Sequence, residues 1–364
     1  MAEPTTSQAY WIAFNHVPGI GPAKTSRLLA HFGSLQAAWE ATPGQLAAAG
    51  LDRRAIEQLV AVRRTFSFEK TLAHLERHGI TVLTWDDDAY PARLRTIPAS
   101  PPVLYVRGSL TPEDEWALAV VGTRRITRYG QEVTRRLVEP LAAEGVTIVS
   151  GLALGVDALA HRTALDAGGR TIAVLGSGVD QIYPSSNRAL ARRIIEHGAL
   201  ISDYPPGTPP EPNNFPPRNR IISGLSLGVL VIEAGEKSGA LITANYALEQ
   251  GREVLAVPGS ILSAQSRGTN RLIADGATPV CSAEDILQAL NLEWLDSQRE
   301  VQRIAPENPL EQAILDALRD GPRHVDDLGR TLDLDAATVT STLAFLELKG
   351  HVRAVGGMTY VRVR

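Results

Sequence analysis

Short stretches that carry glycine, arginine or lysine recur along the middle of this 364-residue chain, most of them directly after an apolar run. Examples are residues 122–125, 150–157, 176–180, 218–220 and 237–239. Glycine allows close approach of the backbone, and guanidinium and ammonium groups bind phosphate oxygens. The free N–H groups at the start of a following helix attract anions in the same way. Residues of these types in this pattern predict a site that holds phosphate.

Sixteen residues are candidates for contacts with phosphate or with nucleic-acid bases. They are Gly122, Thr123, Arg124, Arg125, Ser150, Gly151, Tyr183, Asn187, Arg188, Phe215, Arg218, Asn219, Arg220, Lys237, Ser238 and Gly239. Aromatic residues accompany the cations, and the bases of single strands stack on such rings. Taken singly, Tyr129, Tyr183, Tyr204 and Phe215 are each better explained by core packing. Because the loop from Tyr183 to Arg188 places a ring close to a cation, at least one ring is expected to be exposed and available for stacking.

Catalysis has weaker support than binding. Asp157 and His161 lie four residues apart and share a helix face, but no Ser or Cys nucleophile is identifiable beside them, so a structural Asp–His hydrogen bond is favoured. The chain has no phosphate loop of the Gly-x-x-x-x-Gly-Lys-Ser/Thr type, and Gln181 replaces the third glycine of a dinucleotide fingerprint. No metal-ligand cluster stands out. We therefore expect neither catalysis nor a cofactor nor a metal.

The elements that position these residues are strands alternating with helical segments. The apolar runs that predict strands are Ala117–Val121, Val146–Val149, Thr171–Leu175, Ala199–Ile201, Gly228–Ile232 and Glu253–Val257. This alternation predicts an α/β fold with a parallel sheet and helices on both faces. All strands of a parallel sheet end at one edge, where open α/β folds bind ligands. The candidate residues should therefore converge on a single crevice.

The chain divides into regions of different sequence texture. Residues 1–68 are helical and contain Val17–Lys24, which resembles a helix–hairpin–helix turn; a plain interhelical turn and a DNA contact are about equally expected there. Residues 69–290 form the α/β core, and 291–307 are a linker. Residues 308–364 predict a winged helix, with helices at Leu310–Leu318, Val325–Leu332 and Ala336–Leu348. A terminal hairpin over His351–Val363 is expected to turn at Gly356–Gly357.

The recognition helix predicted for this domain, Ala336–Lys349, offers Lys349 as its only cation, against Glu347. Readers of the major groove bring Arg, Asn or Gln to base edges and several cations to phosphates. Protein contact or weak accessory DNA binding is therefore expected of the winged helix.

Composition limits the class of protein. Thirty-six Lys and Arg against 40 Asp and Glu give a net charge of −4, so any anion site must be local. The single cysteine, Cys281, excludes an internal disulfide and a cysteine zinc cluster. The chain has no apolar run of about 18 residues, so no membrane span is predicted. Its first residues lack a signal-peptide pattern. A soluble cytoplasmic protein is expected.

A series of motifs in fixed order closely resembles the bacterial DNA-processing protein A family (DprA, also called Smf). It covers roughly residues 70–290 and comprises 121–125, 150–161, 173–180, 183–184, 215–226, 237–244, 251–254, 257–260 and 268–273. The resemblance implies an extended Rossmann-like core that binds single-stranded DNA, forms a homodimer and has no established catalysis. It further implies an N-terminal SAM-like domain and a C-terminal winged helix. The DNA-contacting arginine of the family's Gly-Ser/Thr-Arg motif falls on Arg124.

The leading hypothesis is a sequence-independent single-stranded DNA binder. By the family resemblance it would protect incoming strands in natural transformation and help to load the RecA recombinase. One alternative is a phosphoribohydrolase-type enzyme with a Rossmann-like fold, although its Pro-Gly-Gly-x-Gly-Thr loop would here be split between Pro258–Ser260 and Gly268–Thr269. Another alternative is a transcription factor that acts through the winged helix.

Overall fold

A computed structural model of the protein describes residues 6–292, 309–319, 321–348 and 352–362. These residues form two compact units, one that ends at Leu290 and one that follows it. Residues 293–307 of the predicted linker lie outside the described residues, as do Lys349, His351 and Val363.

A nine-stranded sheet organises the first unit, in the order β1-β2-β6-β5-β4-β3-β7-β8-β9. Its strands are β1 Thr81–Thr84, β2 Val103–Gly108, β3 Ala117–Val121, β4 Thr147–Ser150, β5 Thr171–Val174, β6 Gly198–Ser202, β7 Gly228–Val231, β8 Glu253–Ala256 and β9 Thr278–Pro279. From β6 to β9 every pairing is parallel, which confirms the predicted α/β fold class. The antiparallel strands β1 and β2 extend one edge and were not predicted.

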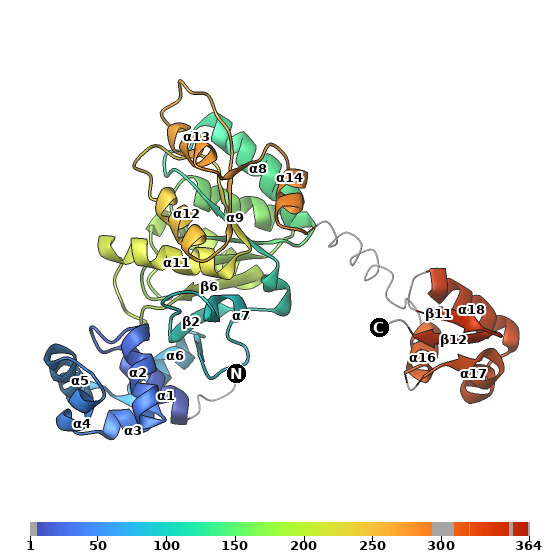
Figure 1. The fold of residues 1–364 in the computed structure, drawn as a ribbon, viewed down its shortest axis with the longest axis horizontal. Helices are drawn as coiled ribbons and strands as arrows, with labels where there is room; N and C mark the ends of the chain where they lie inside the picture. The colour runs from blue at the N-terminus through green and yellow to red at the C-terminus, as the bar shows by residue number, and fades with distance from the viewer. Residues whose placement is uncertain (1–5, 293–308, 320, 349–351, 363–364) are drawn as a thin grey trace. The chain divides into compact units, whose positions relative to one another are not determined.

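Helices cover both faces of this sheet. Those of the core are α7 Ala92–Arg95, α8 Arg128–Ala143, α9 Val156–Asp166, α10 Arg188–His197, α11 Phe215–Leu225, α12 Ala240–Glu249, α13 Arg267–Ala274 and α14 Ala283–Ala289. One layer contains α8, α9, α10 and α14, and the other contains α7, α11 and α12 (Figure 1). The central strands are therefore buried on both faces, as their continuous apolar runs require; every residue of β3 is buried.

The strand order reverses direction between β3 and β7. From β3 the chain adds β4, β5 and β6 on one side, and it then returns through α11 to place β7 on the other side of β3. Val121 of β3 pairs with Val231 of β7, so the two strands end at the same level. This reversal is a topological switch point, where loops leave to opposite faces and open a crevice.

Among the described residues, six helices precede the sheet: α1 Thr6–Asn15, α2 Pro22–Phe32, α3 Leu35–Glu40, α4 Pro43–Ala48, α5 Arg53–Thr65 and α6 Phe68–Arg77. Side-chain oxygens of Ser34, Thr42, Asp52 and Ser67 cap the starts of α3 to α6, which explains why short helices are stable here. Their apolar side chains share one hydrophobic cluster with Val103 and Tyr105 of β2. The helical segment is therefore packed against the antiparallel edge of the sheet.

The second unit has the expected winged-helix arrangement. Its elements are α16 Pro309–Ala317, β10 Arg323–His324, α17 Val325–Leu332, α18 Ala336–Leu348, β11 Val352–Gly356 and β12 Thr359–Arg362, with sheet order β10-β12-β11. The predicted hairpin turn was wrong by one residue. Gly356 pairs with Thr359, so the turn residues are Gly357 and Met358, which both have positive φ, +57° and +58°.

Candidate nucleic-acid interface

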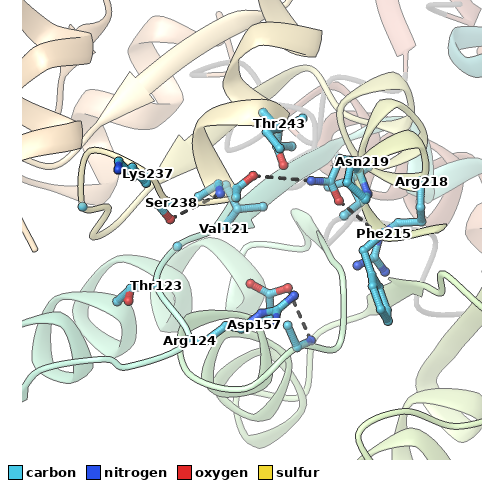
Figure 2. Close-up of a pocket in the computed structure, with 18 of the residues that line it drawn as sticks. Val121, Thr123, Arg124, Asp157, Phe215, Arg218, Asn219, Lys237, Ser238 and Thr243 are labelled. Atoms are coloured by element: carbon cyan, nitrogen blue, oxygen red, sulfur yellow. Dashed lines mark hydrogen bonds between the residues drawn. The ribbon is translucent and has the colours of Figure 1, made fainter. Parts of the chain in front are cut away.

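A cavity of about 750 Å³ opens at the switch point between β3 and β7 (Figure 2). Its walls come from the loops after these two strands and from the first turns of α9, α11 and α12. Eleven of the sixteen predicted residues line it: Gly122, Thr123, Arg124, Arg125, Tyr183, Phe215, Arg218, Asn219, Lys237, Ser238 and Gly239. Segments more than 100 residues apart in the sequence therefore meet in one site.

Two glycines allow the loops on one wall to approach closely. Gly155 has a φ of +79°, and a Cβ atom there would overlap the carbonyl oxygen of Thr123. A Cβ atom on Gly151 would lie 2.7 Å from Nη2 of Arg218. Larger residues at these positions would push the β3 and β4 loops away from each other and from the cavity floor.

The floor of the cavity is a buried polar network around Arg218. Nη1 of Arg218 donates to the carbonyl oxygen of Gly151 at 3.0 Å and to that of Val174, while its Nε donates to Oδ1 of Asn219 at 3.2 Å. Oδ2 of Asp157 accepts from the amide of Gly151 at 3.1 Å. Arg218 is 5% exposed. It therefore ties the loop after β4 to β5 and α11, which is a structural role.

Burial sets the titration of these two groups. Burial lowers the pKa of Arg218 to about 10, and the neighbouring carboxylate of Asp157 partly opposes this shift. Burial raises the pKa of Asp157, whereas Arg218 and the amides of Gly151 and Ala153 act to lower it. Each of these largely buried groups stabilises the charged form of the other.

The accessible cations lie above this floor. Arg124, Arg125 and Lys237 are exposed, and none of them takes part in an ion pair between described residues. With Arg218 they make four cations in the cavity wall, against Asp157 as its one carboxylate. The local charge is therefore 4 − 1 = +3, in a chain whose net charge is −4. This concentration of positive charge would attract an anion.

Helix α12 adds backbone dipoles to this charge. Its first turn contains no acidic residue, and Ser238, Gly239 and Ala240 at its start line the cavity. The two other helix starts are less available to an anion. Asp157 occupies the first turn of α9, and α11 has Pro216 near its start, where a backbone N–H donor is lost. The position between Arg124, Lys237 and the start of α12 is therefore the best place for a phosphate.

Two aromatic rings line the same cavity. The ring centroids of Tyr183 and Phe215 are 5.7 Å apart, and Tyr183 is 50% exposed. The guanidinium carbons of Arg124 and Arg218 lie 6.0 and 5.8 Å from the Phe215 centroid. Tyr129 lies outside the cavity lining and donates to the carbonyl oxygen of Pro258.

Five predicted residues do not line the cavity: Ser150, Gly151, Asn187, Arg188 and Arg220. Buried Ser150 donates to the Val120 carbonyl oxygen, and buried Asn187 donates to that of Leu152, so both side chains support loops. Arg188 is exposed at the start of α10. Arg220 points elsewhere on α11 and pairs with Asp203 at 2.8 Å.

One buried carboxylate beside the site was not predicted from the sequence. Glu233, just after β7, accepts hydrogen bonds from the amide and the hydroxyl of Thr127, at 3.0 and 2.6 Å. Thr127 is the N-cap of α8, so the carboxylate fixes the end of the loop that carries Arg124. Gln265 and Thr243 were also missed as lining residues. Glu233 directly follows the predicted strand Gly228–Ile232, and Thr243 lies in the motif 237–244. Only the strand order, however, brings these side chains and Gln265 to the same place.

The predicted Asp157–His161 hydrogen bond was wrong. Nδ1 of His161 lies 2.6 Å from the Thr171 hydroxyl, and its Nε2 is buried without a partner in the described part of the chain. Within the residues that the structure describes, no group of three or more His, Cys, Asp or Glu side chains could hold a metal ion. Among the described helices, none has the length and apolar character to cross a membrane.

Comparison with known proteins gives consistent matches. Residues 81–291 match the family described as DNA recombination-mediator protein A, and residues 298–358 match the DprA winged helix domain. Protein Smf of Synechocystis sp. (strain ATCC 27184 / PCC 6803 / Kazusa) is 38% identical over 394 residues, which cover 98% of this chain and 99% of the relative. The predicted family is thereby confirmed.

Two solved structures are similar to this one. The X-ray structure of DNA processing protein A from Streptococcus pneumoniae has a TM-score of 0.67 and 34% identity, over 79% of this chain and 98% of that one. DNA processing protein A from Helicobacter pylori has a TM-score of 0.53 and 30% identity, over 58% of this chain and 95% of that one. The latter structure was described for its unique single-stranded DNA binding mode.

Proposed function

This chain belongs to the DNA recombination-mediator protein A family, and we propose that it binds single-stranded DNA, without regard to base sequence, in the cavity at the β3–β7 switch point. The observation that carries the proposal is the set of three exposed cations, Arg124, Arg125 and Lys237, in the cavity lining beside two aromatic rings and the start of α12. None of the three forms an ion pair with another residue that the structure describes. Cations bind the phosphates of any strand, and rings stack on any base.

Each group in the cavity has a role in this proposal. Arg124 and Lys237 bind phosphate oxygens together with the N–H groups at the start of α12. Tyr183, whose ring is half exposed, stacks on a base next to the bound phosphate. Arg218, Asp157 and Glu233 hold the loops in place and do not contact the strand. Contacts with phosphates and stacking on rings carry no information about base identity, so affinity should depend little on sequence.

Membership of the family supports the proposal of a wider biological role. We propose a homodimer in the cytoplasm that protects incoming single strands during natural transformation and helps to load RecA. Three domains, 1–68, 69–290 and 308–364, would divide this work. The second unit would contact a protein or bind DNA weakly, because the described part of α18 has no lysine or arginine on its exposed surface.

Fluorescence anisotropy with a labelled oligothymidine tests the binding proposal. We expect the strand to bind more tightly than a duplex of equal length. The log–log slope against salt should reach about −2, since three accessible cations contribute about −0.7 each. Arg124→Ala should weaken binding to all sequences alike and reduce the slope by about 0.7, whereas Arg54→Ala, an exposed arginine on α5, should change neither. Equal affinity for strand and duplex would refute the proposal.

Two further experiments separate the alternatives. A transcription factor that acts through its winged helix would lose DNA binding when residues 293–364 are deleted, whereas binding in the β3–β7 cavity would be largely kept. An enzyme of the phosphoribohydrolase type would release free base from nucleoside monophosphates. We expect no release, and turnover that is lost on Asp157→Ala would favour the enzyme.

A further inference from the structure

A second cavity lies where the N-terminal helices meet the core, and its volume is about 250 Å³. Its walls come from α1, from the Val17–Pro22 hairpin before α2, from β2, from the loop after β6 and from α11. The first cavity uses Arg218 and Asn219 of α11, whereas this one uses Arg220 of the same helix. Helix α11 therefore contributes side chains to both cavities.

One ion pair in this second cavity has unused hydrogen-bonding capacity. Nη2 of Arg220 meets Oδ2 of Asp203 at 2.8 Å. Nη1 of Arg220 and Oδ1 of Asp203 are buried and have no hydrogen-bond partner in the described chain. The pair is thus bonded through one atom of each group. It leaves one donor and one acceptor unsatisfied, which is unfavourable unless a ligand or water meets them.

Other polar groups around this pair already have partners. Nδ2 of Asn15 donates to the carbonyl oxygen of Asp203, and Oδ1 of Asn15 accepts from Tyr105. The indole N–H of Trp11 donates to Asp86. Arg220 and Asp203 are therefore the main polar side chains of the cavity lining that lack part of their hydrogen bonding. Their unsatisfied atoms have almost no exposed surface in this structure, so a ligand that carries an acceptor and a donor would have to displace the neighbouring groups to meet them.

The remaining walls favour a flat, partly apolar ligand. Trp11, Phe14 and Tyr204 line the cavity, and burial raises the pKa of Tyr204 to about 12, so this ring is neutral. Pro18 and Gly19 of the hairpin are the exposed lining residues and place the mouth beside the helix–hairpin–helix turn. Aromatic walls with one donor and one acceptor are typical of pockets that take an unstacked nucleobase.

We propose that this second cavity, between the N-terminal helices and α11, binds one nucleobase of a single-stranded nucleic acid through Arg220 and Asp203. Each of the four DNA bases carries an acceptor next to an N–H donor on its Watson–Crick edge. Arg220 can donate to the acceptor and Asp203 can accept from the donor, whichever base is present. The site would therefore hold a base without selecting its identity, which agrees with the sequence-independent binding proposed above. This inference rests on that proposed function, because the bound single strand supplies the base.

A free nucleoside tests the site without depending on the first cavity. The probe is 2-aminopurine deoxyriboside, whose fluorescence is quenched when the base stacks, titrated into the full-length protein. In Gly21→Val a side chain is added to the cavity wall at a position where a Cβ meets no atom within 4 Å and φ is −112°, so the fold should be kept. Gly44→Val on α4, with equally open space, is the matched control.

We expect saturable quenching by the wild-type protein, weakened at least about tenfold in Gly21→Val and unchanged in Gly44→Val and Arg124→Ala. Absence of saturable quenching, or equal quenching by Gly21→Val, would overturn the inference. Loss in Arg124→Ala alone would overturn it too, because the probe would then occupy the first cavity. If the protein quenches the probe but has no affinity for oligothymidine, the proposed function is refuted and this site is supported.

Cross-linking of the wild-type protein provides a readout that needs no variant. An oligothymidine with one 5-iodouracil is irradiated in the complex, and the linked peptides are mapped. Attachment to Trp11, Phe14 or Tyr204 is the expected result, since these rings line the second cavity. Attachment only to Tyr183 or Phe215, which line the first cavity, would overturn the inference.

Discussion

Replacing Arg218 by alanine should destabilise the core, whereas replacing Arg124 by alanine should weaken DNA binding and leave stability unchanged. Both arginines line the same cavity and both approach the ring of Phe215. Arg218 is 5% exposed and bonded to two backbone carbonyls, while Arg124 is exposed and belongs to no ion pair of the described residues. The same residue type therefore has two different roles.

The expected magnitudes follow from these contacts. Arg218→Ala removes hydrogen bonds from a charged donor and leaves the carbonyl oxygens of Gly151 and Val174 without that donor. It also leaves the buried carboxylate of Asp157 without its neighbouring cation. Loss of one partner of such a buried charge pair costs about 3–5 kcal/mol. This corresponds to a fall in Tm on the order of 10 °C for a unit of this size.

Arg124→Ala should change the free energy of unfolding by less than about 0.5 kcal/mol, because the side chain is exposed. The loss of one charge-assisted phosphate contact should cost about 1.5 kcal/mol in binding, roughly tenfold in Kd. Thermal unfolding followed by circular dichroism measures the first quantity, and anisotropy with oligothymidine measures the second. Arg54→Ala on α5 controls for the removal of an exposed arginine in both assays.

Two results would refute this reasoning. Arg218→Ala that melts at the wild-type temperature would show that the buried guanidinium does not hold the loops together. Arg124→Ala that lowers Tm as much as Arg218→Ala does would show that Arg124 is also structural. In either case exposure and hydrogen bonding would not distinguish the two arginines, and the assignment of phosphate contacts would have to be revised.

Three other predictions concern single positions. Burial lowers the pKa of His161 from 6.5 to about 3, so between these pH values the unfolded state binds a proton that the folded state does not. The free energy of unfolding should therefore fall as the pH falls, by about 2 kcal/mol at pH 5. If urea titrations show the same full loss in His161→Gln, this attribution to His161 is wrong. Gly155→Ala should lower the free energy of unfolding by at least about 2 kcal/mol, and Gly168→Ala by about 1 kcal/mol. Both glycines have positive φ, but only at Gly155 would a Cβ atom overlap a neighbouring atom. Equal urea midpoints for the two variants would contradict this prediction. Tyr183→Ala should weaken oligothymidine binding by about 1–3 kcal/mol, whereas Tyr129→Ala, equally exposed outside the cavity, should have little effect in anisotropy.

The sequence was informative wherever a short-range pattern determines the structure. Runs such as Ala117–Val121 and Gly228–Val231 are buried strands as predicted, because strands covered on both faces need continuous apolar residues. The glycine-bearing loops also follow these strands as expected. The antiparallel edge of β1 and β2 was missed, because its strands pair across about 20 residues that contain no hairpin turn signal.

The composition of the site was harder to predict than its existence. The motif Arg218–Arg220 suggests two equivalent cations, but a helix turns by about 100° per residue, so the two side chains leave α11 in different directions. Arg218 enters the floor of the first cavity and Arg220 the wall of the second. Ser150 and Asn187 were predicted to contact phosphate or a base, yet their side chains donate hydrogen bonds to backbone carbonyls. Only packing determines which polar side chains of a loop stay free.

The arrangement of charge also explains how an acidic protein could prefer single strands. A net charge of −4 repels a polyanion at long range, and the repulsion acts along the whole length of a stiff duplex. The excess of three positive charges is confined to the lining of one cavity of about 750 Å³. A flexible strand can bring one phosphate into this cavity and place the adjacent base on Tyr183, whereas the bases of a duplex are already paired and stacked. Preference for single strands would then come from the local shape of the site and would survive a moderate rise in salt, although the affinity itself would fall.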